Sequence, residues 1–249
     1  MTEVCGKKKL LISTNRKISK PGHYYLDKDI YLDDKSFKKK PYGIRIISDN
    51  VVLDFQGNGL HFTGGKETVN FGIFIKVSKN VKIINAKVIG FYYGLHAIKS
   101  KILHVENCNF EASRYIGICA AGENIYIENN IISNMAFQNR KAEDNYLIGM
   151  NINADKVIIK HNIIKNLFIS NENSDLKLEY VGILIGIGSK NCLVENNQLL
   201  NNTIPVGQSY AIWCGEESRV NILNNILVNY AYDVGASQAF IGFKGHSVT

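Results

Sequence analysis

The amino-acid sequence predicts an all-β fold, a single-stranded right-handed parallel β-helix of about seven coils with an N-terminal cap. Three observations predict this fold. A short motif of glycine and alternating apolar residues recurs along the chain, a second β-type segment follows most copies, and asparagines recur at fixed places in or after that segment. Strands this short cannot form a stable sheet within one repeat, so they must stack on their neighbours, as repeats do in solenoids.

The recurring motif is a glycine followed by Ile-x-Ile or a close variant. Its starts are 22 to 33 residues apart, which sets the shortest coil near 22 residues. The starts are Gly43, Gly72, Gly94, Gly117, Gly149 and Gly182, with Ala211 as a weaker copy. Alternation of this kind is typical of strands, and no segment shows a sustained helical period.

Two asparagine columns follow from aligning the second segments. The first column contains Asn85, Asn107, Asn129, Asn196 and Asn224, with His161 in one coil, and the second contains Asn130, Asn162, Asn197 and Asn225. A buried amide must be hydrogen-bonded, and identical amides on coils about 4.8 Å apart can bond to one another. The columns therefore predict amide ladders along the stack.

The chain divides into an N-terminal capping segment, residues 1–40, and a β-helix domain, residues 41–249. With 249 residues, of which 45% are hydrophobic, it is long enough to bury one core. The capping segment is rich in lysine and is expected to cover the unpaired strand edges of the first coil.

Charge, cysteine content and hydropathy limit the partners and the compartment. The formal net charge of +7 suits an acidic partner, and nucleic acid is disfavoured because no motif for it is present. Five cysteines without a CxxC motif favour reduced thiols. No secretory leader and no apolar run of about 18 residues is recognised, so the sequence predicts a cytoplasmic protein without a membrane span.

The Gly-Ile-x-Ile motif, followed by segments of the type Asn-Val-x-Ile-x-Asn-Asn, resembles the pectate-lyase-like family of parallel β-helices, in particular its short-repeat type. The resemblance covers about residues 41–245 and implies that a polysaccharide binds in a groove over the first strand of each coil. The chain lacks the acidic calcium ligands beside that strand, the spaced aspartates of pectin hydrolases and the DPHE-type motif of alginate epimerases. No metal or other cofactor is therefore expected.

Insertions between the repeats emerge along one edge and are expected to wall this groove. Within each motif the apolar residues face inward, so the residue between them faces outward. These outward residues are Arg45, Phe74, His96, Cys119, Asn151, Leu184 and Trp213, and the residues before each glycine are Tyr42, Phe71, Tyr93, Ile116, Ile148, Val181 and Tyr210. An exposed strip with this many aromatic residues is either a platform for sugar rings or a patch covered by the chain's own loops or by a second copy of the chain.

The candidate catalytic residues lie around His96. They are His96, Tyr93, Arg114, Asp144 and Cys119, and the candidate substrate-binding residues are Arg45, Phe74, Asn151, Trp213, Tyr146, Tyr180 and Arg140. Lyase or epimerase chemistry on a uronate needs a base for the proton beside the carboxylate and a cation for the enolate. His96 or Tyr93 is the candidate base or acid, and Arg114 is the candidate carboxylate clamp.

Other functions remain open at this point. Carboxylates on facing loops, such as Asp144 and Glu179, suit glycoside hydrolysis, and His96 beside Cys119 suits a thiolate nucleophile. The sequence predicts a carbohydrate-active protein that acts on an anionic, uronate-type glycan by lyase or epimerase chemistry. The alternative is a non-catalytic module that binds glycans or forms homo-oligomers through the aromatic strip.

Overall fold

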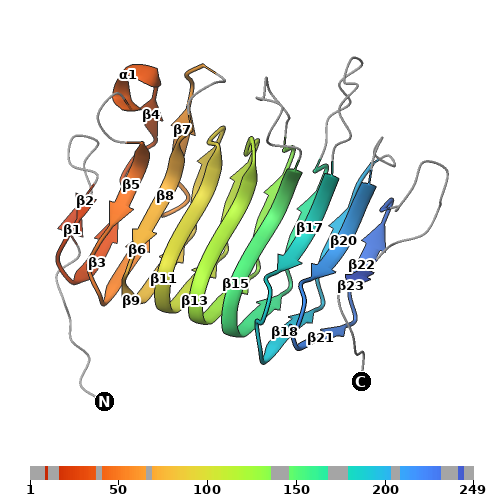
Figure 1. The fold of residues 1–249 in the computed structure, drawn as a ribbon. Coiled ribbons are helices and arrows are strands. Elements are labelled where there is room, and N and C mark those ends of the chain that lie inside the picture. Colours follow the sequence, from red (N-terminus) through yellow and green to blue (C-terminus); the bar gives the residue numbers. More distant parts are fainter. Residues whose placement is uncertain are drawn as a thin grey trace.

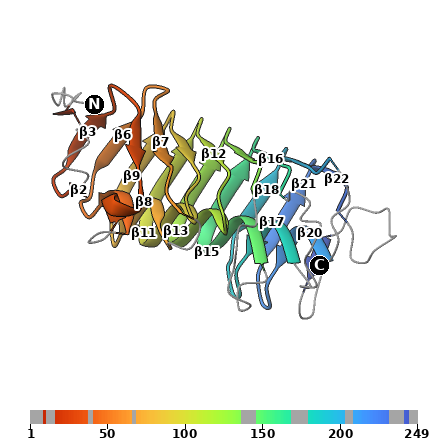
Figure 2. The ribbon, with the colours of Figure 1, turned by 90° about the horizontal axis from the view of Figure 1, so that it is seen from above.

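A computed structural model describes residues 9–10, 17–37, 41–65, 69–135, 146–167, 179–202, 208–230 and 241–243. These residues form a parallel β-helix, in which coils of short strands stack along one axis (Figures 1 and 2). Strands of successive coils pair in parallel into one sheet of 15 described strands and another of eight. The predicted all-β fold is confirmed.

The strands form three strips along the stack. The first strip contains β2 (Lys17–Ile18), β5 (Tyr42–Ile46), β8 (Phe71–Lys76), β17 (Glu179–Ile185), β20 (Gln208–Cys214) and β23 (Ile241–Phe243). The second contains β1 (Lys9–Leu10), β3 (Gly22–Tyr25), β6 (Val51–Asp54), β9 (Lys79–Ile84), β18 (Cys192–Glu195) and β21 (Val220–Leu223). Three long strands, β11 (Tyr93–Glu106), β13 (Ile116–Glu128) and β15 (Tyr146–Lys160), continue through both strips.

The third strip is the separate eight-stranded sheet. It contains β4 (Ile30–Leu32), β7 (Gly59–Phe62), β10 (Lys87–Ile89), β12 (Asn109–Glu111), β14 (Ile131–Ser133), β16 (Ile163–Lys165), β19 (Gln198–Leu200) and β22 (Ile226–Val228). Its strands are only three or four residues long, because the chain turns after each one to begin the next coil.

The glycines that begin each motif are required by close packing. A Cβ on Gly72 would lie 2.4 Å from Cγ1 of Val88 in the third strip and 2.5 Å from the carbonyl oxygen of Gly94 on the next coil. Both distances are shorter than side chains tolerate, so only glycine lets the first and third strips meet here. The motif begins with glycine because the coil is too narrow at this position for a side chain.

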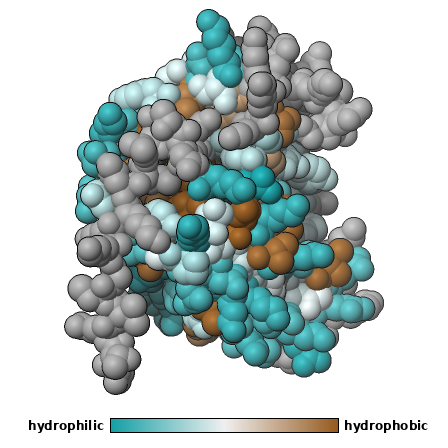
Figure 3. All heavy atoms as spheres, turned by 90° about the vertical axis from the view of Figure 1, so that its left-hand side faces the viewer, coloured by the Kyte–Doolittle hydropathy of each residue, from teal (hydrophilic) through white to brown (hydrophobic). Residues whose placement is uncertain are grey.

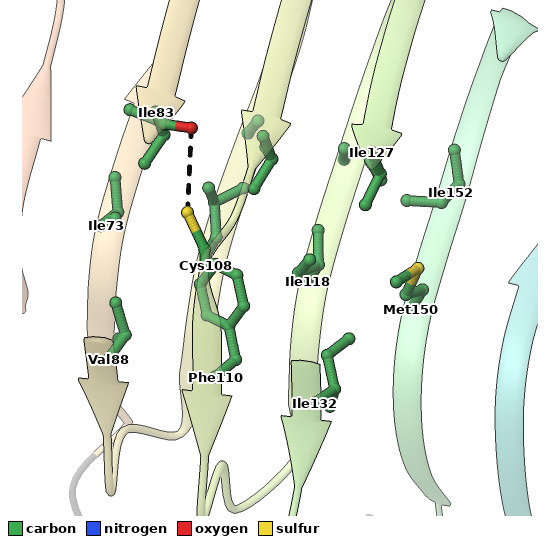
Figure 4. Close-up of a cluster of buried hydrophobic side chains, with 14 of the residues drawn as sticks. Ile73, Ile83, Val88, Cys108, Phe110, Ile118, Ile127, Ile132, Met150 and Ile152 are labelled. Atoms are coloured by element: carbon green, nitrogen blue, oxygen red, sulfur yellow. Dashed lines mark hydrogen bonds between the residues drawn. The ribbon is translucent and has the colours of Figure 1, made fainter. Parts of the chain in front are cut away.

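Inward side chains of the three strips fill one continuous core (Figure 4). Ile73, Ile118 and Met150 come from the first strip, Ile83 and Ile127 from the second, and Val88, Phe110 and Ile132 from the third. All of them are fully buried. Burial of each such side chain contributes roughly 1.5–3 kcal/mol, which is repeated on every coil.

Only the second asparagine column forms the predicted ladder. Nδ2 of Asn130 donates to Oδ1 of Asn162 at 3.0 Å, Asn162 donates likewise to Asn197 at 2.9 Å, and Asn197 donates to Asn225 at 3.0 Å. Cys108 occupies the same position one coil before Asn130, whose Oδ1 accepts the backbone N–H of Cys108 at 2.9 Å. The ladder thus ends where a thiol replaces the amide.

The first column has a different role from the one expected. Its residues adopt left-handed backbone conformations, with φ between 53° and 57°, at the corner between the second and third strips. Asparagine tolerates this conformation better than most residues do. The side chains are mostly exposed, and the described members of this column share one side-chain hydrogen bond, between Asn196 and His161 at 3.4 Å. The prediction of a buried ladder is wrong for this column.

The described part of the N-terminal segment continues the stack. It supplies strands to all three strips, since β2 pairs with β5, β3 with β6 and β4 with β7. The helix α1 (Asp34–Phe37) then places Phe37 against Phe62 and Phe91, at ring-centroid distances of 5.4 and 6.2 Å. Figure 3 shows that the described surface at this end is largely hydrophilic around a small apolar centre. The division at residue 40 stays a prediction.

Candidate functional site

Two columns of side chains run along the outer face of the first strip. The edge column, before the glycines, contains Tyr42, Phe71, Tyr93, Ile116, Ile148, Val181 and Tyr210. The middle column contains Arg45, Phe74, His96, Cys119, Asn151, Leu184 and Trp213. Each residue pairs in register with the next, as the repeat predicts. Packing nevertheless divides the strip into two regions of different character.

The N-terminal region is an aromatic cluster of Tyr42, Phe71, Phe74, Tyr93 and His96. The Phe71 ring contacts those of Phe74, Tyr93 and His96, with centroids 5.3, 5.0 and 5.2 Å apart. Tyr93 also stacks on His96 at 4.9 Å, and Phe74 stacks on Tyr42 at 6.0 Å. Ring pairs at such distances stabilise each other beyond their buried area. These rings therefore offer much of their surface to one another rather than to a ligand.

His96 is held among these rings. Burial lowers the pKa of His96 below its ordinary value of 6.5, because desolvation disfavours the charged imidazolium. Its Nδ1 is buried and has no hydrogen-bond partner among the described residues. Arg45 lies two coils away in the same column, about 10 Å along the axis, and its Nη1 donates to the Tyr42 hydroxyl at 3.1 Å. His96 is thus a neutral imidazole without an adjacent cation from its own column.

Arg114 is buried beneath this region, with 5% of its surface exposed. Its guanidinium donates to the carbonyl of Gly65 at 3.3 Å and to Oδ1 of Asn70 at 3.2 Å. The guanidinium carbon also lies 5.2 Å from the Phe62 ring centre and 5.9 Å from that of Tyr92. These contacts connect the turns of different coils. The sequence predicts that Arg114 clamps a substrate carboxylate, but its guanidinium is buried and engaged within the protein.

Cys119 pairs in register with His96, as the sequence predicts. Burial raises the pKa of the Cys119 thiol to about 11, because the thiolate would be poorly solvated. A neutral, half-buried thiol beside a neutral imidazole lacks the ion pair that activates cysteine nucleophiles. The arrangement disfavours covalent catalysis by this residue.

The C-terminal region contains a groove over β17, which lies between β15 and β20 in the sheet (Figures 1 and 2). We call it the aromatic groove, because Tyr115, Tyr146, Tyr210 and Trp213 line it around the aliphatic Val181 and Leu184. Its volume is about 390 Å³, within the range of small-molecule sites. Trp213 and Tyr146 keep exposed surface beside Leu184, the outward residue of β17, whereas Tyr210 is buried and its ring centroid lies 4.3 Å from that of Trp213.

Two carboxylates, Glu179 and Glu216, lie at opposite ends of the aromatic groove. Glu179 begins β17, and Glu216 follows Cys214, whose partner in register is Ile185 at the end of β17. The strand between these ends is about 20 Å long. Burial raises the pKa of Glu179. The described lining contains no Lys, Arg or His.

The separation of these carboxylates excludes one chemistry for them. Retaining glycosidases need carboxyl groups about 5–5.5 Å apart, and inverting glycosidases need about 6.5–9.5 Å. Side chains rooted at the two ends of a strand of about 20 Å cannot meet either requirement. Glu179 and Glu216 are therefore not a hydrolytic pair.

The candidate residues named from the sequence thus fall in several places. Tyr146 and Trp213 line the aromatic groove; His96, Tyr93 and Phe74, with Arg45 beside them, form the N-terminal region; Cys119 and Asn151 lie between the two. Asp144 and Arg140 lie outside the described residues. Tyr180 is a correction: it belongs to the core, because strand alternation turns it inward while its neighbours Glu179 and Val181 turn outward.

Sequence reasoning missed the far end of the groove, formed by Gly186, Ile187, Gly215 and Glu216. These residues follow the first-strip strands of two adjacent coils, and Gly188 donates its N–H to the carbonyl of Glu216 at 2.8 Å. The sequence does contain a sign of this end of the groove: glycines directly follow two successive motifs, in Gly186-Ile187-Gly188 and at Gly215. Turn glycines beside a strip of outward aromatics mark where such a groove ends.

Two searches of the described part of the chain returned nothing. No group of three or more His, Cys, Asp or Glu side chains there is placed to hold a metal ion. Within the same ranges, no helix has the length and hydropathy that a membrane crossing requires.

Comparison with known proteins identifies the scaffold. A family model described as "Right handed beta helix region" matches residues 71–242, while no curated protein matches the sequence. Among solved structures, the chain is similar to the surface protein and adhesin PfbA of Streptococcus pneumoniae, with 12% identity, a TM-score of 0.36, and coverage of 92% of this chain and 91% of that one. It is also similar to the catalytic domain of a GH87 alpha-1,3-glucanase in complex with tetrasaccharides, with 12% identity, a TM-score of 0.26, and coverage of 95% and 64%.

Proposed function

This chain belongs to the right-handed β-helix family, and we propose that it binds a glycan in the aromatic groove over β17. The observation that carries the proposal is the open surface between Tyr146 and Trp213, with Leu184 beneath it. The C–H faces of sugar rings pack on aromatic rings, and the tyrosine hydroxyls add hydrogen bonds to sugar hydroxyls. The groove follows β17, so it suits a short oligosaccharide lying along the strand.

Binding without cleavage is the function that this geometry supports best. The two lining carboxylates are too far apart for hydrolysis. Lyase or epimerase chemistry on a uronate, which the sequence also predicts, needs a base beside a cation, and the described lining of the groove offers carboxylates as bases but no Lys, Arg or His as the cation. His96 lies in the other region of the strip, three coils before Leu184 in the same column.

The test is calorimetric titration of the full chain with a panel of defined tetrasaccharides, uncharged and acidic. We expect at least one to bind, and Trp213→Ala to weaken it at least tenfold, the loss typical of a central aromatic contact. Trp213→Phe, which keeps a ring, should lose less. Phe74→Leu, in the same column but in the aromatic cluster, is the matched control and should bind as the wild type does.

Circular dichroism and urea unfolding of each variant separate loss of binding from loss of folding. Products are followed by mass spectrometry and by the absorbance of unsaturated sugar ends. A glycan that binds equally well to the wild type and Trp213→Ala would contradict the proposed site. Accumulation of cleaved or epimerised sugar would contradict the non-catalytic function.

A further inference from the structure

We propose that the aromatic groove selects uncharged glycans and rejects uronates, because Glu179 and Glu216 hold a negative charge at each end of it. This inference rests on the proposed function and names the chemical class of its ligand. The composition suggests a different ligand, an anionic glycan, because the chain as a whole carries a net charge of +7. The described lining of the groove carries two carboxylates and no cation, which is opposite in sign to the net charge of the molecule.

Glu179 is positioned to act on a ligand. It pairs in register with Tyr146 on β15, and both residues line the groove. The carboxyl is partly buried, and this desolvation raises its pKa. No Lys, Arg or His among the described residues forms an ion pair with it. A second carboxylate brought alongside would meet a like charge that no described cation neutralises, in a partly buried place.

Glu216 places a second negative charge at the other end, where its electrostatic repulsion is weaker. It is exposed, so water and salt screen its charge more strongly. Arg219, three residues further on, is exposed and lies outside the groove lining. A glycan lying along β17 therefore meets a carboxylate at each end and aromatic or aliphatic side chains between them. Uncharged hydroxyl groups can donate hydrogen bonds to both carboxylates, whereas uronate carboxylates cannot.

The experiment uses matched ligands in which each carboxylate is either free or capped by a methyl group, which removes its charge. Tetrasaccharides of galacturonate and glucuronate are each titrated as the free acid and as the full methyl ester, at neutral pH and low salt. The expected result is that the ester binds at least about ten times more tightly than the acid, because like charges are opposed without compensation. In Glu179→Gln this ratio should collapse to within about twofold, and in Glu216→Gln it should fall by less.

Glu128→Gln is the control. Glu128 lies outside the groove lining, in the second-strip part of β13, and its substitution removes the same charge from the molecule as Glu179→Gln does. It should leave the ratio of the wild type unchanged. An acid that binds as tightly as its ester, or more tightly, overturns the inference and leaves the proposed glycan site intact. A ratio that Glu128→Gln reduces as much as Glu179→Gln does also overturns it, because the effect would then come from net charge. Absence of binding by every ester and every uncharged tetrasaccharide overturns the proposed function and this inference together.

Discussion

The two regions of the first strip share one backbone and one register, yet they present different surfaces. In the aromatic cluster, ring follows ring on successive coils, and Phe71 alone contacts three others. In the aromatic groove, the middle column passes from Cys119 through Asn151 to Leu184 before it reaches Trp213. The smaller residues at these positions coincide with the groove over β17, whose lining includes Tyr146 and Trp213.

The difference indicates that side-chain size decides where the outer face of a regular solenoid forms a groove. Coils about 4.8 Å apart bring neighbouring rings into contact whenever both carry one. Trp213 faces Leu184 on the preceding coil, so it has no ring contact with that neighbour in its own column. The cluster is therefore expected to serve stability and the groove to serve binding, and substitutions can separate these roles.

The largest effect is expected for Phe71→Ala in the aromatic cluster. Loss of three ring contacts should lower the free energy of unfolding by about 2 kcal/mol, less than for a fully buried phenylalanine because Phe71 is only half-buried. Tyr146→Ala in the groove is the matched control: its ring is 42% exposed, so the loss should stay within about 0.5 kcal/mol. Urea denaturation measures both, and equal losses would show that the two regions do not differ as described.

A smaller free-energy change is expected when an additional aromatic ring is placed in the groove, as in the aromatic cluster. Leu184→Trp places a ring opposite Trp213 and fills the space over β17, so glycan binding should fall about tenfold, or about 1.4 kcal/mol. Stability should change by less than about 1 kcal/mol because Leu184 is only partly buried, on the outer face of the strip. Val77→Trp, also exposed but outside the groove, controls for added aromatic surface. Unchanged binding in Leu184→Trp would mean that the ligand lies elsewhere.

The smallest effect is the pH dependence that His96 gives to the cluster. Its pKa in the folded chain is lowered by burial, so the unfolded chain takes up this proton first as the pH falls below 6.5. The free energy of unfolding therefore falls in that window and is unaffected above it. His96→Phe should lose less stability than the wild type between pH 7 and pH 5, while Phe74→Leu, which removes no titrating group, should keep the slope of the wild type. Identical slopes in His96→Phe and the wild type would contradict a neutral, buried imidazole.

Much of the fold was predictable because each coil repeats the same physical requirement. The motif glycines, the alternating apolar residues and the second asparagine column all report contacts between neighbouring coils, and these contacts recur along the stack. The first asparagine column was assigned the wrong role. In sequence, an asparagine that bonds within a ladder looks the same as one that tolerates a left-handed corner, and the two columns are adjacent.

The candidate site was less predictable. Alternation placed the outward columns correctly, but it could not show that Arg114 turns inward to Gly65 and Asn70, far away in sequence. Tyr180 was misplaced because the strand β17 begins before the motif glycine, and the inward side of that extension includes this tyrosine. Contacts between segments that are not repeats leave no periodic signal.

The sequence by itself determined the winding of the chain and the register of its coils, because hydrophobic period, glycine spacing and stacked amides are local patterns that many coils repeat. Only the tertiary structure decided which stretch of the outer strip is open, because that depends on how unlike side chains meet across adjacent coils. Glu216 and Tyr146 line one groove although 70 residues separate them in the chain. Their proximity is a property of the stack and not of any one repeat.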